Sequence, residues 1–243
     1  MKTIRRLNTA LLKYIFVDSY STDLRLEFVN DLLSVSKDFQ PIKGLNVASC
    51  HSLSPLKTIC NGINLFTTFK FDDSGELDLV FHGNYMDKTE TFALESIDTN
   101  YYVSMVMRAV NHKMYALRIV DFNLSEPREK YYRISKCLMD DEKMENFISV
   151  TYEIPQFERF KENNKKISEL TKIERWLCYF SSKTSEDEIF ELGKIDNRIR
   201  QAITLENKFF ENEDNLREYE KIEKENFEAI AETERVLKKM DNQ

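Results

Sequence analysis

The sequence predicts an α/β fold, a mixed β-sheet flanked by helices, for a chain of 243 residues. Apolar residues recur with a helical period near both ends of the chain, whereas the middle follows the shorter period of strands. Gly and Pro are scarce, five and four, which is unlike an all-β sandwich built on tight turns. The predicted order is two helices, two strands, a helix, three strands and a helical C-terminal part, which together make a mixed sheet covered by helices.

Two helices are predicted at the N-terminus. Residues 3–17 carry an apolar stripe at helical spacing. Ser21 or Thr22 can cap a second helix over residues 23–35, which places its leucines and Phe28 on one side.

A β-hairpin is predicted after a loop over residues 36–62. This loop is rich in Ser, Gly and Pro. The stretches "INLFTTFKF" (63–71) and "ELDLVFHG" (76–83) then read as two strands around the turn "DDSG".

The second half of the chain continues the sheet and ends in helices. A helix is expected over residues 87–108, followed by a buried strand over 114–124. Two further strands are expected over residues 131–138 and 147–155, separated by "MDDEKMEN". From Phe157 to the end the pattern is helical.

The C-terminal region differs from the rest in charge. Residues 205–243 hold twelve acidic and seven basic residues, a local net charge of −5. The whole chain has a net charge of −7, so residues 1–204 contribute only −2. We therefore divide the chain into a mixed-sheet domain of residues 1–180 and an acidic helical extension of residues 181–243. Its last helix, about 212–240, is expected to pack on the domain or on a partner chain, which makes a homo-oligomer possible.

Composition places the protein in the cytoplasm and away from membranes. No run of about 18 apolar residues is present, and the apolar N-terminal segment is interrupted by polar residues and lacks a small-residue cleavage site. The four cysteines are far apart with no CxxC pair, which favours reduced thiols.

Four stretches of the chain share their order and spacing with a known family. They are the N-terminal "TALLKYIF", the strand "YALRIVDFNL", the strand-to-helix segment "VTYEIPQFER" and the helix "IERWLCYF". Together they resemble the recombination-promoting nuclease/transposase (Rpn) family, which has the PD-(D/E)xK nuclease fold. The resemblance covers about residues 7–180 and implies a nuclease-like core with an acidic helical extension.

The chemistry of that fold requires particular residues on its hairpin. Phosphodiester hydrolysis uses a divalent cation that activates a water and neutralises developing charge. Mg²⁺ prefers hard oxygen ligands, so two carboxylates on neighbouring strands hold it. A Gln or Lys two residues after the second acid points to the same side of the strand and can position the water.

This chain has lost those groups at the positions that match. The first acid of the family falls on Asn64, the second acid on Val80, the Gln on His82 and an accessory acid of the first helix on Thr9. Val80 can ligate no metal. The resemblance therefore implies a retained fold without its metal site, for which no cofactor is expected. Mg²⁺ or Mn²⁺ is expected only if the protein is an active nuclease.

Two alternative sites stay open. A shifted register takes Asp78 and Glu95 as the acids, but it leaves Ile97 at the Gln position and too little chain for the helix expected before "RIVDF". Asp78 and His82 also lie two positions either side of Val80, so they share its face and could bind a transition metal.

A nucleic-acid surface is the other candidate site. Residues 108–136 hold seven basic residues against three acidic ones, with Tyr131 and Tyr132 nearby. Such a group can track phosphates, although solvent-facing strands carry the same residues. The seven are Arg108, Lys113, Arg118, Arg128, Lys130, Arg133 and Lys136.

Three functions are therefore compatible with the sequence. The first is a pseudonuclease that binds DNA, a related nuclease or another protein of a mobile element or phage–host conflict. The second is an active divalent-metal-dependent DNA endonuclease with displaced acids. The third, compatible with either, is a scaffold that oligomerises through its acidic C-terminal helices.

Overall fold

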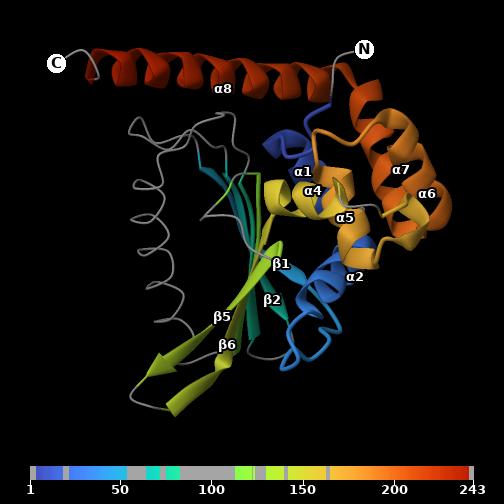
Figure 1. Cartoon of the computed structure of the whole chain (residues 1–243), viewed down its shortest axis with the longest axis vertical. Helices are drawn as coiled ribbons and strands as arrows, with labels where there is room; N and C mark the ends of the chain where they lie inside the picture. The colour runs from blue at the N-terminus through green and yellow to red at the C-terminus, as the bar shows by residue number, and fades with distance from the viewer. Residues whose placement is uncertain are drawn as a thin grey trace.

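A computed structural model describes residues 4–18, 22–53, 64–71, 75–82, 113–121, 123, 130–139, 142–162 and 165–240. Within these residues a mixed six-stranded sheet flanked by helices forms the fold, as the sequence predicts (Figure 1). The strands are β1 (Asn46–Leu53), β2 (Asn64–Phe71), β3 (Gly75–His82), β4 (Lys113–Val120), β5 (Tyr132–Met139) and β6 (Glu142–Glu153). The helices are α1 (Thr9–Phe16), α2 (Thr22–Leu33), α4 (Ile154–Glu162), η2 (Ile167–Glu169), α5 (Lys172–Phe180), α6 (Glu186–Ile195), α7 (Asn197–Glu211) and α8 (Glu213–Met240).

The sheet has the strand order β1-β2-β3-β4-β6-β5. β1, β2 and β3 form an antiparallel meander, β3, β4 and β6 are parallel, and β5 returns antiparallel to β6. The parallel strands β3, β4 and β6 all finish at one end of the sheet, which we call the carboxyl end. β4 is buried along most of its length, as expected for a central strand covered on both faces.

One face of the sheet is covered by α1, α2 and α5 through a cluster of aromatic rings. Phe28 of α2 lies 4.5 Å from Phe16 of α1 and 4.8 Å from Trp176 of α5, measured between ring centroids. Phe81 of β3 lies 5.5 Å from Phe180 of α5. All five side chains are buried, so this cluster joins the N-terminal helices, the sheet and α5 in one core.

The C-terminal helices continue this core. Leu192, Ile199 and Phe209 of α6 and α7 are buried in the same cluster as the residues of α1. The side chain of Tyr219, near the start of α8, accepts a hydrogen bond from the backbone N–H of Arg5 at 2.8 Å. From there α8 runs across the molecule at the end of the sheet where α4 begins (Figure 1).

The loop predicted over residues 36–62 is wrong in part, because it contains β1. The sequence of β1, "NVASCHSL", has no clear alternation of apolar residues. Among the described strands β1 pairs only with β2 and lies at the edge of the sheet, and Val47 remains 43% exposed. Its backbone is held by the hydrogen-bond ladder rather than by a buried face, so the sequence pattern is weak.

Several predicted boundaries also differ from the structure. The first helix begins at Thr9 rather than residue 3, since Asn8 caps it by accepting a hydrogen bond from the backbone N–H of Ala10. The segment "MDDEKMEN" lies mostly within the β5–β6 hairpin instead of linking two short strands. α4 starts directly at Ile154, before the predicted Phe157.

The C-terminal helical region is broken more often than predicted. Asp196 ends α6 and also caps α7, where its carboxylate accepts hydrogen bonds from the backbone N–H groups of Arg198 and Ile199. The stretch "DEIFELGKIDNRIRQAITL" (187–205), whose pattern predicts one helix, therefore forms parts of two. The helix expected over residues 87–108 and the turn "DDSG" lie outside the described residues, except for Gly75.

Candidate functional site

The β2–β3 hairpin brings the positions matched to the nuclease family onto one face of the sheet. Val80 lies opposite Phe66, and Asn64 lies opposite His82, in the antiparallel register. Directly opposed residues share a face, and so do residues two apart on a strand. Asn64, Val80 and His82 therefore share one face, with Asn64 diagonal to Val80. The side chains of Asn64 and His82 lie outside the described part.

Asp78, the alternative acid, is on the same face and is fully buried. Its Oδ1 accepts a hydrogen bond from Oγ1 of Thr68, its cross-strand partner, at 2.8 Å. Val80 is only 7% exposed. A buried carboxylate held by a strand neighbour stabilises the hairpin, and this arrangement favours a structural role for Asp78 over metal binding.

Thr9, the position matched to the accessory acid, is the first residue of α1. It is 4% exposed, and its Oγ1 has no hydrogen-bond partner among the described residues. Just before it, the side chain of Asn8 donates hydrogen bonds to the backbone carbonyl of Tyr219 and to Glu223, at 3.3 and 2.8 Å. The start of α1 is thus covered by the acidic helix α8.

The basic residues are brought together only in part. Arg118 and Arg133 lie in one row across the sheet, either side of Thr151, and the same row contains Val80. Nε of Arg133 is 2.8 Å from Oε1 of the buried Glu153. Arg118 is therefore the direct cross-strand neighbour of Val80, whereas Arg133 lies two strands further along the row and is engaged by an internal carboxylate.

The other basic residues do not extend this row within the described part. Lys113 begins β4 at the far end from the carboxyl end, with its ammonium 5.4 Å from the ring of Tyr115. Lys130 precedes β5 and lies 5.8 Å from the ring of Tyr132. Arg108, Arg128 and the side chain of Lys136 lie outside the described residues.

Two carboxyl groups near the carboxyl end of the sheet were missed by the sequence reasoning. Asp121 directly follows β4, and burial, followed by the negative charge of Glu158, raises its pKa to about 7. Arg5 and Lys183 oppose this shift. A carboxyl group with a pKa near neutrality can exchange a proton at physiological pH, which makes Asp121 a candidate functional residue.

Glu158 is held by its own partners. It is 8% exposed, accepts a hydrogen bond from Ser181 Oγ at 2.5 Å, and lies 2.9 Å from Nζ of Lys183. The sequence carries a signal for Asp121, since an acid directly after a buried parallel strand lies where ligands bind in open α/β sheets. Glu158 carries none, because it is one of several charges on the amphipathic α4.

The described residues contain no group of three or more His, Cys, Asp or Glu side chains placed to hold a metal ion. None of the described helices has the length and apolar character that a membrane span requires. Comparison with protein-family models, with curated proteins and with solved structures gave no match.

Proposed function

We propose that this protein is a nuclease-like protein that has lost its catalytic metal site and acts by binding another macromolecule. The observation that carries the proposal is Val80. It occupies the position of the second catalytic acid in the resemblance to the Rpn family, and it is buried on a face that it shares with Asn64 and His82. A valine offers no oxygen to a cation.

The sheet supports the assignment of these positions. The resemblance requires a hairpin that carries both acids and then a crossover to a further strand. β2 and β3 form the hairpin, and the strand that contains "RIVDF", β4, is parallel to β3. A parallel neighbour needs a crossover connection, as the family's order of elements demands.

The charge of α8 favours a protein partner over DNA at the carboxyl end. Glu223 binds Asn8 and lies 3.6 Å from Arg5, so α8 is anchored beside the start of α1. Residues 218–228 carry five acidic and two basic residues. This negative charge repels phosphates, which favours a protein partner with a basic surface, such as a related nuclease.

The test is a cleavage assay on supercoiled and linear DNA with Mg²⁺ or Mn²⁺. We expect no metal-dependent cleavage by the native protein. The same assay is run on the Asp78→Ala/His82→Ala variant. Metal-dependent cleavage by the native protein that disappears in this variant would overturn the proposal and identify an active nuclease.

A restored variant tests the matched positions separately. Asn64→Asp, Val80→Glu and His82→Gln together rebuild the family's ligand set, and we expect Ca²⁺ or Mn²⁺ to bind this variant more tightly than the native protein, measured by calorimetry. The matched control is Phe66→Glu, which places an acid on the same face opposite Val80. Equal metal affinity of the restored and control variants would show that the positions are misassigned.

One observation favours a second candidate, an active divalent-metal-dependent DNA endonuclease. Asp121 and Glu158 are two acids whose charges interact near the carboxyl end of the sheet. In this case Asp121→Asn abolishes Mg²⁺- or Mn²⁺-dependent cleavage, whereas Asp78→Ala does not. This pair of variants separates a site at Asp121 from one at Asp78.

A further inference from the structure

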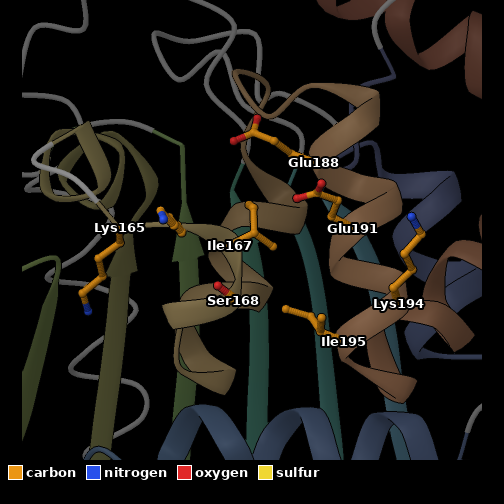
Figure 2. A pocket seen from close by; sticks show the side chains of 8 residues that line it. Lys165, Ile167, Ser168, Glu188, Glu191, Lys194 and Ile195 are labelled. Atoms are coloured by element: carbon orange, nitrogen blue, oxygen red, sulfur yellow. The ribbon is translucent and has the colours of Figure 1, made fainter.

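A hollow of about 500 Å³ lies between the η2 turn and α6 (Figure 2). Ile195 extends from α6 toward η2, where Ile167 and Ser168 lie, so the hollow has apolar groups on both sides. Three lysines, Lys165, Lys166 and Lys194, also line it. A space of this size accepts an aromatic side chain together with parts of its neighbours.

Two exposed aromatic rings lie beside lysines that line the hollow. Phe190 is 66% exposed and Phe160 is 37% exposed. The ammonium group of Lys194 lies 4.2 Å from the ring of Phe190, and that of Lys165 lies 4.8 Å from the ring of Phe160. Ile195, which itself lines the hollow, is 43% exposed, and exposed apolar groups of this kind occur at interaction sites.

A complementary feature is present on α8 of the same chain. Phe227 is 72% exposed, the highest value among the exposed large apolar side chains of the described residues. It lies beyond Tyr219, where α8 packs on the body. The residues that precede and flank it, 218–228, hold five acidic and two basic residues.

We propose that Phe227 of one copy inserts into the hollow between η2 and α6 of a second copy. The ring would lie against Ile167 and Ile195, and the acidic turns of α8 would face Lys166 and Lys194. Lys161 lies 2.6 Å from Glu188 and neutralises one of the two carboxylates that line the hollow. Lys165 is in turn paired with Glu174. Lys166 and Lys194 therefore outnumber the remaining carboxylate, Glu191, where the acidic helix docks.

This contact is heterologous, because the two partners use different surfaces. After the first contact forms, the pair of copies still has one free Phe227 and one free hollow, so further copies can add until a ring closes or a filament grows. The proposal does not depend on whether the protein is a pseudonuclease or an active nuclease, since neither surface includes the hairpin.

Two variants, each of which removes one surface, test the proposal by sedimentation velocity over about two decades of concentration. Phe227→Glu keeps only the hollow, and Lys166→Glu/Lys194→Glu keeps only the aromatic side chain. We expect the native protein to associate, each variant alone to remain monomeric, and an equimolar mixture to form dimers and nothing larger. Lys208→Glu, an exposed charge reversal on α7, is the control and is expected to associate like the native protein.

Three results would overturn the proposal. The first is a native protein that stays monomeric throughout the range, and the second is a mixture of the two variants that forms no dimer. The third is a Lys166→Glu/Lys194→Glu variant that associates as the native protein does, since this would indicate that two α8 helices pair with each other. The substituted side chains are all exposed, so we expect circular dichroism to show that every variant is folded.

Discussion

Arg6 and Glu206, which are 200 residues apart in the sequence, form a two-pronged ion pair inside the core. Nε of Arg6 donates to Oε2 of Glu206 at 2.8 Å, and Nη2 donates to Oε1 at 3.0 Å. Their side chains are 3% and 4% exposed. The hydroxyl of Tyr179 donates a further hydrogen bond to Glu206 at 2.8 Å. The ion pair therefore connects α7, in the C-terminal extension, with the segment before α1.

We expect Glu206→Ala to lower the free energy of unfolding by about 3–5 kcal/mol, because it leaves a buried guanidinium without its main partner. Among the acidic residues that the structure describes, Glu186, 3.6 Å away and half exposed, would remain near Arg6, together with the ring of Tyr179. Urea unfolding measures the change. The double variant Arg6→Met/Glu206→Leu should recover a large part of the loss, since neither charge is then buried. A loss below about 1 kcal/mol in Glu206→Ala would contradict a tight internal pair.

The hydrogen bond between Thr68 and Asp78 gives a prediction that separates structure from catalysis. We expect Asp78→Ala to cost about 1–3 kcal/mol of unfolding free energy, since it leaves the buried hydroxyl of Thr68 without this acceptor. Thr68→Val should also destabilise the protein, by a smaller amount. Lys70→Thr, on the exposed end of β2, is the control and should change stability by less than about 0.5 kcal/mol. A fully stable Asp78→Ala variant would remove the structural role assigned to this acid.

The pKa of Asp121 makes stability depend on pH. Its pKa is raised from 3.8 to about 7 by burial and by the charge of Glu158. Between these two values the folded protein holds a proton that the unfolded chain has released, so a rise in pH through this window lowers the free energy of unfolding. Below the window both states are protonated, and above it both are ionised, so the contribution no longer changes.

Asp121→Asn removes this titration. We expect the variant to be more stable than the native protein at pH 8 by about 2 kcal/mol, with the difference shrinking toward pH 4. Urea unfolding at several pH values measures it, and carboxyl NMR shifts report the pKa of Asp121 directly. Glu158→Gln should lower that pKa because it removes the neighbouring negative charge. An unchanged pH profile in Asp121→Asn would show that Asp121 is ionised across the whole range.

The start of α5 is held by a capping box. Thr171 Oγ1 accepts from the backbone N–H of Glu174 at 3.3 Å, and the Glu174 carboxylate accepts from the backbone N–H of Thr171 at 2.8 Å. Lys165 also donates to Glu174 at 2.7 Å. We expect Thr171→Ala to cost about 1 kcal/mol in thermal or urea unfolding. Thr171→Ser keeps the hydroxyl and should be close to the native protein. Equal losses in both variants would argue against the cap.

The sequence predicts the elements whose local pattern is strong. The hairpin expected over residues 63–71 and 76–83 is found as Asn64–Phe71 and Gly75–His82. The buried strand expected over residues 114–124 is found as Lys113–Val120. Apolar residues at the period of a strand indicate its buried face, and this pattern does not depend on which element covers that face. These strands can therefore be predicted from the sequence alone.

The candidate site is only partly readable in the same way. The sequence establishes that a valine stands between Asp78 and His82. It does not show that Arg118 and Arg133 flank Thr151 in the row of Val80, because that row depends on the register of four strands. A shift of one residue in any strand would turn its side chains to the other face.

The sequence by itself determined the fold class, the hairpin and the absence of a carboxylate at Val80. Composition and apolar periodicity are properties of short stretches of chain, so they do not depend on which distant segments pack together. Tertiary structure alone decided that β1 joins the sheet, that Arg6 meets Glu206, and that Asp121 lies where burial and the charge of Glu158 raise its pKa. These features join residues far apart in the chain. They form because particular surfaces pack together and exclude water, and the energy of such contacts depends on both partners at once.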